Sequence, residues 1–289
     1  MSDKREIDPV TGQETTGHEW DGIRELDTPM PRWWLWTFYA TIAWSVAYMI
    51  AMPAIPLVSD YTKGVLGYSQ RESVRMDIAE AREAQSGLRS RIEEASLEEI
   101  LDVADLREFA VAGGQSAFAV NCSQCHGSGG AGAPGYPNLN DDAWVWGGSL
   151  ERIHEIIRVG IRSEHPDTLF NEMPAFLKDE LLPRDQVDDV VEYVLAISGQ
   201  DHEVESADRG RGVFLEQCAA CHMESGKGDR ELGAPNLTDA IWLYGGDRES
   251  IWNTVADPRN GVMPNWDDKL DPVTRKQLAI YVHQLGGGE

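Results

Sequence analysis

The amino-acid sequence predicts a mainly helical protein, in which one N-terminal transmembrane helix precedes two tandem copies of a small helical domain. Three observations lead to this fold class: a window of 26 uncharged residues at 33–58, an internal repeat, and two C-x-x-C-H motifs that use all four cysteines. The length of 289 residues accommodates about two compact domains. With 49 acidic against 25 basic residues, the net charge of −24 argues against a nucleic acid as a partner.

The uncharged window is long enough to span a membrane. About 20 helical residues cross a hydrocarbon core of roughly 30 Å. Three tryptophans between residues 33 and 36, and Tyr61 beyond the other end, suit the aromatic belts at the two interfaces. A buried core helix rarely runs this long without charge, and a cleaved signal peptide would begin nearer the N-terminus. We therefore expect a membrane anchor that is retained.

Both cysteine motifs have the spacing that attaches a c-type haem. The motif residues are Cys122, Cys125 and His126 in the first copy, and Cys218, Cys221 and His222 in the second. On one helical turn, residues i and i+3 share a face, so both sulfurs reach the haem vinyl groups and the following imidazole reaches the iron. A zinc knuckle would require a further Cys or His pair nearby, and a dithiol motif needs no histidine here. The sequence thus predicts two covalently bound haems c, with these histidines as iron ligands.

The repeat extends beyond the cysteines. The matched positions are Gly114, Phe118 and Cys122 with their equivalents 96 residues later, Pro137 and Trp144 with theirs 98 residues later, and Met173-Pro174 with Met263-Pro264. This preserved order indicates duplication of a domain, with eight more residues in the first copy between Arg158 and Met173.

The predicted organisation has five parts. They are an irregular polar segment at 1–31, a transmembrane helix at 32–58, a charged helical spacer at 59–104, a first domain at 105–200 and a second at 201–289. The linker around residues 200–208 is short, so we expect the two domains to lie against one another.

Each repeat resembles a class I cytochrome c domain. The resemblance implies an N-terminal helix with Gly and Phe four residues apart, and a C-terminal helix whose tyrosine packs on that Phe. The expected pairs are Phe118 with Tyr193 and Phe214 with Tyr281, each within one repeat. The glycine lets the two helices cross closely.

A methionine is the expected sixth iron ligand in each repeat. Met173 and Met263 follow the haem histidines of their own repeats by 47 and 41 residues, and each precedes a proline. The cytochrome c family places its axial methionine there, and a thioether raises the haem potential. We assign Met173 to haem 1 with His126, and Met263 to haem 2 with His222. The competing histidines are His154, His165, His202 and His283; none has a counterpart in the other repeat, and His165 is the one to examine.

Further contacts to the haems are expected from two matched pairs. Pro137 and Pro235 correspond, in the cytochrome c family, to a proline whose carbonyl accepts the N–H of the proximal imidazole. Trp144 and Trp242 either bond a haem propionate or serve as core residues, and the sequence leaves both open.

The whole chain resembles the dihaem subunit III of cbb3-type cytochrome c oxidases, most specifically at residues 17–23, 31–36 and 233–246. The resemblance implies an electron-transfer subunit with no catalytic residues of its own, within a proton-pumping terminal oxidase. It would pass electrons from a soluble or membrane cytochrome c towards the monohaem and haem–copper catalytic subunits. It also implies a bacterial inner-membrane protein of one span, with a cytoplasmic N-terminus and periplasmic haem domains.

Two other classes of function compete for the same residues. A free-standing membrane-anchored dihaem cytochrome c, or the cytochrome subunit of a periplasmic dehydrogenase, would not need the Trp/Pro/Gly-rich sequence before the span. A dihaem peroxidase would need a vacant or displaceable ligand, which the two Met-Pro loops argue against. The sequence leaves open the order of the haems and whether methionine–haem pairing crosses between the domains.

Overall fold

The computed structural model describes residues 5–287, and the chain separates into two compact units, 1–83 and 84–289. The first unit begins with an antiparallel hairpin of β1 (Thr15–Trp20) and β2 (Ile23–Leu26). Asp21 and Gly22 join the strands with φ of 49° and 84°, the positive values that an Asp-Gly turn supplies to a two-residue hairpin. The expectation of an irregular segment at 1–31 is therefore wrong for residues 15–26, because the Asp-Gly turn lets the two strands pair.

Helix α1 (Arg32–Ala51) follows the hairpin and is 20 residues long, with no buried residue. It begins after Pro31, a residue whose carbonyl accepts from Trp34 and Leu35. Across residues 5–287, no helix combines the length and the mean hydropathy of a membrane span.

The charged spacer expected at 59–104 becomes part of the core at its end. Helix α2 (Gln70–Glu94) and helix α3 (Leu97–Asp102) bury Ile92 and Ile100 completely. The Lys276 ammonium donates to the carbonyls of Ile92, Glu93 and Ala95 at 2.8–3.0 Å. A cation suits this position because the last carbonyls of a helix lack intrahelical partners.

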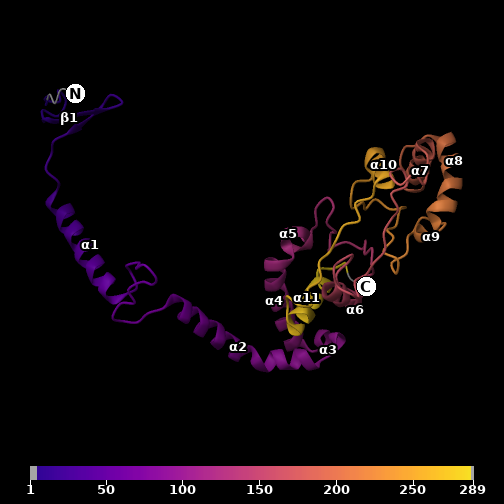
Figure 1. Cartoon of the computed structure of the whole chain (residues 1–289), viewed down its shortest axis with the longest axis horizontal. Coiled ribbons are helices and arrows are strands. Elements are labelled where there is room, and N and C mark those ends of the chain that lie inside the picture. The colour runs from indigo at the N-terminus through magenta and orange to yellow at the C-terminus, as the bar shows by residue number, and fades with distance from the viewer. Residues whose placement is uncertain (1–4, 288–289) are drawn as a thin grey trace. The chain divides into compact units, whose positions relative to one another are not determined.

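The remaining helices carry the two repeats (Figure 1). In the first repeat they are α4 (Ala104–Asn121), α5 (Ser123–His126), η1 (Ser128–Gly130), α6 (Leu150–Val159) and α7 (Arg184–Ile197). In the second they are α8 (Val204–Gln217), α9 (Ala219–His222), α10 (Arg248–Ala256) and α11 (Pro272–His283).

The long helices pair between the repeats and not within them. In Figure 1, α7 lies along α8, and the yellow α11 lies along the magenta α4, the two pairs with the most extensive helix contacts. The Phe118 and Tyr281 ring centroids are 5.4 Å apart, and those of Phe214 and Tyr193 are 5.1 Å apart. The expected pairing of each phenylalanine with the tyrosine of its own repeat is therefore wrong.

Glycines permit both of these crossed contacts. A Cβ added at Gly114 of α4 would overlap the main-chain oxygen of Gln277 in α11. A Cβ added at Gly210 of α8 would overlap the main-chain oxygen of Asp189 in α7. The predicted role of these glycines in close helix crossing is confirmed, with exchanged partners.

Two hydrophobic cores result from this exchange. Core 1 combines α4 and α6 with α11, and its buried members include Phe118, Ile153 and Leu278. Core 2 combines α8 and α10 with α7, and its buried members include Phe214 and Val191. Each core thus contains the N-terminal half of one repeat and the C-terminal half of the other.

The short connection between α7 and α8 gives a physical reason for the exchange. Residues 198–203 join these helices, and helices joined by so few residues pack as antiparallel neighbours at a small loop-closure cost. The Glu192 carboxylate, which is 8% exposed, accepts from the Glu203 N–H at 2.7 Å and from Arg248 at 3.0 Å. Because α7 packs beside α8, the surface of α4 remains available and α11 packs against it.

Candidate haem sites

Each C-x-x-C-H motif folds as one helical turn at the end of a long helix. In the first motif, the Cys122 carbonyl accepts from the Cys125 N–H at 3.1 Å and from the His126 N–H at 2.9 Å. The equivalent bonds from Cys221 and His222 to the Cys218 carbonyl measure 3.2 and 2.9 Å. All four thiols are free. The turn therefore places two sulfurs on one face with the imidazole directly after them, as thioether attachment requires.

Both histidine rings are held by a proline carbonyl. His126 Nδ1 lies 3.1 Å from the Pro137 oxygen, and His222 Nδ1 lies 3.0 Å from the Pro235 oxygen. A carbonyl can only accept, so each Nδ1 carries the proton and each Nε2 keeps its lone pair for a metal. Burial lowers the pKa of both imidazoles, against the opposing effect of these hydrogen bonds. The neutral form that binds iron is thus the favoured one.

The first cysteine of each motif sits in a partly buried position. Burial, with the neighbouring cysteine, raises the pKa of Cys122 and of Cys218 to about 11. Each thiol is therefore protonated at neutral pH and packs as a small apolar group, Cys122 against core 1 and Cys218 against core 2.

The loop after each motif has the same hydrogen bonds in both repeats. The Gly132 N–H donates to the His126 carbonyl at 2.7 Å, and the Gly228 N–H donates to the His222 carbonyl at 3.0 Å. Both glycines have positive φ, 71° and 77°. A Cβ at either position would also collide with the loop main chain that leads to the proline. These loops consequently fix the proline carbonyls that hold the histidines.

Each methionine packs against the core that lies beside the cysteine turn of the other repeat. Met263 packs against core 1, which also contains Cys122, whereas Met173 packs against core 2 with Cys218. The structure therefore does not bring Met173 together with the cysteine turn of its own repeat, as the within-repeat assignment requires. The physical reason is the helix exchange, because each methionine loop leads directly into the exchanged helix, α7 or α11.

Main-chain hydrogen bonds anchor each methionine loop to the other repeat. The Trp266 N–H donates to the Ile157 carbonyl at the end of α6, at 3.1 Å. The Phe176 N–H donates to the Val255 carbonyl at the end of α10, at 3.2 Å. Gly160, which ends α6 with φ of 72°, allows the Met263 main chain to approach closely.

Trp144 supplies a buried donor beside the first cysteine turn. Its indole packs against core 1, and its Nε1 is buried with no hydrogen-bond partner among the described residues. Trp242 occupies the matching place in core 2. Gly148 and Gly246 leave no room for a Cβ beside these indoles. An unpartnered buried N–H is costly, so the orphaned Trp144 donor fits an acceptor such as a carboxylate supplied by a bound group.

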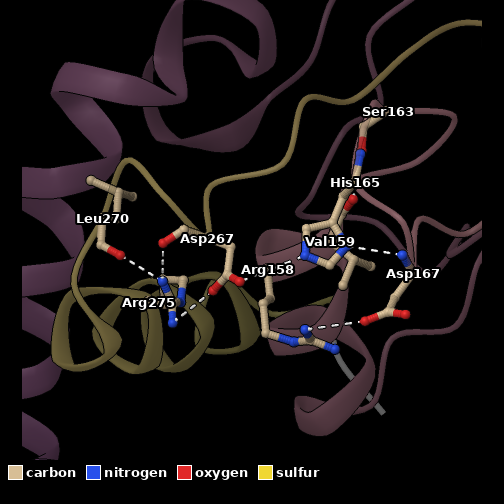
Figure 2. A network of polar contacts seen from close by, with 8 residues as sticks. All are labelled: Arg158, Val159, Ser163, His165, Asp167, Asp267, Leu270 and Arg275. Carbon is tan, nitrogen blue, oxygen red and sulfur yellow. Dashed lines mark hydrogen bonds and ion pairs between the residues drawn. The ribbon is translucent and has the colours of Figure 1, made fainter.

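His165, the main competitor for an iron, belongs to a polar network instead (Figure 2). Its Nδ1 accepts from the Asp167 N–H at 3.0 Å, and its Nε2 lies 3.6 Å from Asp267 Oδ2. Arg275 extends the network by contacting Asp267 Oδ1 at 3.0 Å. Both ring nitrogens of His165 therefore face polar partners of the protein.

The chain crosses between the two cores at residues that no sequence motif marks. Arg162, with φ of 51°, donates to the carbonyls of Gly261 and Asn171 at 2.6–2.9 Å. The only available signal was the different length of the two repeats between Arg158 and Met173, which marks this region without indicating what it contacts.

The geometry defines a class of protein. Two cysteine turns, two histidines with free Nε2 atoms, two core methionines and an orphaned Trp donor fit covalently bound haem c and hence a cytochrome c. No cluster of three or more His, Cys, Asp or Glu side chains forms a metal-ion site between residues 5 and 287.

Comparisons with known proteins identify the family. Residues 12–59 match the N-terminal domain of cytochrome oxidase-cbb3, FixP, and residues 109–194 and 205–282 match cytochrome c oxidase, cbb3-type, subunit III. The chain belongs to the family of cbb3-type cytochrome c oxidase subunit III, and its cytochrome c domains imply covalently bound haem c.

Similar proteins cover the chain almost completely. It is 51% identical to the cbb3-type cytochrome c oxidase subunit CcoP of Cereibacter sphaeroides, over 95% of each chain. It is 50% identical to subunit FixPc of Rhizobium leguminosarum bv. viciae and 47% identical to subunit FixP of Rhizobium meliloti, over 100% of each chain. The resemblance drawn from the sequence is thereby confirmed.

Proposed function

We propose that this protein is the electron-transfer subunit of a cbb3-type terminal oxidase, carrying two haems c. Electrons would enter from a soluble or membrane cytochrome c and leave towards the monohaem and haem–copper catalytic subunits, where oxygen is reduced. The observation that carries the proposal is the matched pair of cysteine turns, each with its histidine held by a proline carbonyl.

The packing supports a crossed set of iron ligands. We assign haem 1 to Cys122 and Cys125, with His126 and Met263 as the residues that would bind its iron. We assign haem 2 to Cys218 and Cys221 with His222 and Met173. This replaces the within-repeat assignment, because each methionine shares a core with the first cysteine of the other repeat.

The side chains that would hold each haem c also make it suitable for electron transfer. A bound haem c supplies one-electron chemistry through its ferric and ferrous states. The proline carbonyls fix the imidazoles and increase their basicity, and the thioethers favour the ferrous state. Core side chains pack beside the first cysteine of each turn, and burial of the bound group among them would keep the rearrangement that accompanies a change of charge small. Trp144 Nε1 is placed to donate to a haem propionate, and Trp242 is the corresponding candidate at haem 2.

Helix α1 is the proposed membrane anchor. Its 20 residues carry charge only at Arg32, and large apolar side chains such as Trp36 (74% exposed) and Trp44 (73%) face outwards. Tryptophan and tyrosine lower the mean hydropathy of this helix, yet they are the residues that favour membrane interfaces. With the cytochrome c domains following the anchor, we place the N-terminus in the cytoplasm and residues 59–289 in the periplasm of a bacterial inner membrane.

The subunit itself would reduce no oxygen. Its proposed iron sites are each completed by a histidine and a methionine, which leaves no position for a substrate. The same point disfavours a dihaem peroxidase. A free-standing membrane-anchored cytochrome remains the alternative function that the test must separate.

The test is to isolate the tagged chain from gently solubilised native membranes. Reduced-minus-oxidised spectra would report haem c and haem b, and oxygen uptake would be measured with reduced cytochrome c. We expect haem c, haem b, copper and cyanide-sensitive uptake to co-purify. Haem c alone, without oxygen uptake, would contradict the assignment to the oxidase and favour a tethered electron carrier.

A further inference from the structure

The main chains of the two methionines are held in different ways. At Met263, the N–H donates to the Ile161 carbonyl at 3.0 Å and the carbonyl accepts from the Ile161 N–H at 2.9 Å. At Met173, the N–H donates to Asn260 Oδ1 and the carbonyl accepts from Asn260 Nδ2, both at 3.3 Å. The Asn260 side chain thus makes the same pair of hydrogen bonds to the Met173 main chain that the Ile161 main chain makes to Met263.

We infer that Asn260 is a positioning residue for Met173, holding its main chain so that the thioether reaches haem 2. The inference rests on the proposed ligation of haem 2 by Met173. Asn260 lies in the second repeat, between α10 and Met263, so it acts across the exchanged halves. Asn260 can also be replaced without changing any proposed iron ligand of either haem.

The local backbone explains why an asparagine suits this position. Asn260 has φ of 45°, in the left-handed region that asparagine and glycine tolerate better than other residues. This conformation turns the chain after α10, and the carboxamide can then present one acceptor and one donor to the same peptide segment. Substitution by a residue with a bulky Cβ branch would strain the turn as well as remove the hydrogen bonds.

Solvent lies close to this contact. An open hollow of about 480 Å³ is lined by Met173, Asn260 and their neighbours, including Asp257. If the carboxamide is removed, water can take over the freed N–H and carbonyl of Met173. The Met173 main chain would then lose its direct hydrogen bonds to Asn260, while the residues that follow it stay in place. The anchors of Phe176 and Lys178 to the end of α10 remain, so the fold should persist.

The experiment uses the full-length holoprotein in detergent with Met263→His as the background. In that background, haem 1 has two histidine ligands, so any sulfur-to-iron charge-transfer band of the ferric protein reports Met173 alone. Imidazole is then titrated as a competing ligand. We expect Asn260→Gly, which keeps the backbone freedom, to bind imidazole on the order of tenfold more tightly, the effect of losing two ordinary hydrogen bonds.

Two further variants separate positioning from general stability. Asn260→Asp retains an acceptor for the Met173 N–H and should give an intermediate imidazole affinity. Ile161→Ala, prepared in a Met173→His background, keeps its main-chain bonds to Met263 and should leave imidazole binding at haem 1 unchanged. The potential of haem 2 should fall in Asn260→Gly, while thermal unfolding stays close to that of the parent.

The outcomes are distinct. A charge-transfer band that persists in Met263→His, with unchanged imidazole affinity and potential in Asn260→Gly, would overturn the positioning role alone. Absence of the band in Met263→His itself would overturn the ligation of haem 2 by Met173 and the inference with it.

Discussion

Phe118 of the first repeat packs against Tyr281 of the second, with ring centroids 5.4 Å apart and planes inclined by 57°. Tyr193 and Phe214 form the reciprocal pair. Because these aromatic pairs join the helices beside the cysteine turns, neither proposed haem site can form from one repeat alone. We therefore expect the two repeats to fold and unfold as one cooperative unit.

A double-mutant cycle measures this exchange directly. Replacing Phe118 and Tyr281 by leucine, singly and together, should reveal a coupling free energy of about 0.5–1.5 kcal/mol for the aromatic pair. The combination of Phe118→Leu with Tyr193→Leu should be additive within about 0.5 kcal/mol, since these residues belong to different cores. Chemical denaturation of the holoprotein provides the free energies. Coupling to Tyr193 and none to Tyr281 would contradict the exchanged fold.

The glycines at the helix crossings should not tolerate a methyl group. Gly114→Ala and Gly210→Ala would push Cβ into main-chain oxygens of α11 and α7, and we expect each to destabilise the protein by about 1–3 kcal/mol or more. Gly212→Ala is the matched control in α8, where a Cβ would meet nothing within 4 Å. This control should stabilise the helix by about 0.5–1 kcal/mol. Equal unfolding temperatures for all three variants would rule out the close crossings.

The crossed methionine assignment predicts which haem responds to each substitution. In a variant that lacks haem 1 through Cys122→Ser and Cys125→Ser, Met173→His should lower the potential of the remaining haem by on the order of 100 mV or more. Met263→His should leave that potential unchanged. The reciprocal variant without haem 2 should show the opposite pattern. Potentiometric titration decides the matter, and a response to Met263→His in the first variant would restore the within-repeat pairing.

Stability should depend on pH through Asp189 at the contact of α7 with α8. Hydrogen bonds from Arg209, at 2.6 and 2.8 Å, lower the pKa of this carboxyl; burial opposes them and Ser206 adds to them. A depressed folded-state pKa stabilises the fold above the unfolded-state value near 3.9, and this contribution is lost as pH falls through the folded-state pKa.

Asp189→Asn should therefore cost about 1 kcal/mol at pH 7, allowing for the exposure of Arg209. The difference from the parent should shrink when the pH is lowered below about 4. Asp208→Asn, an exposed residue of α8, controls for the change in net charge. Denaturation curves across this pH range provide the measurement, and a pH-independent difference would exclude the proposed linkage.

The donor cytochrome should be attracted by charge. The chain has a net charge of −24, so a basic donor would be steered towards it and its association rate should fall as salt rises. Stopped-flow oxidation of a reduced basic cytochrome c at increasing ionic strength tests this, with an acidic cytochrome c as the control. Rates that do not change with ionic strength would remove electrostatic steering from the mechanism.

The local geometry of the candidate haem sites was predictable because it depends on spacing. Cysteines three residues apart share one face of a helical turn, so Cys122 and Cys125 could be interpreted without knowing what packs against them. The contacts of Pro137 with His126 and of Pro235 with His222, which the family resemblance implied, are found in the structure. The resemblance to class I cytochrome c domains also indicated Gly114 and Gly210 as positions where helices cross closely, which the structure confirms.

The partners of these elements could not be predicted, because the two repeats have the same pattern. Phe118 has the same local preference for Tyr193 as for Tyr281, and nothing within one repeat distinguishes a tyrosine of its own domain from one of the other. The choice depends on contacts between residues far apart in sequence and on the connections that join the helices. The role of Asn260 was hidden for the same reason.

The sequence therefore predicted the cysteine turns, the candidate iron ligands, the duplication and the family. Packing between distant parts of the chain pairs α4 with α11 and α7 with α8, and hence sets which methionine shares a core with which cysteine turn. The physical reason is that motif chemistry is set by residues a few positions apart, whereas helix pairing is set by chain connectivity. Residues 198–203 hold α7 and α8 together, and that local contact directs the remaining helices to exchange.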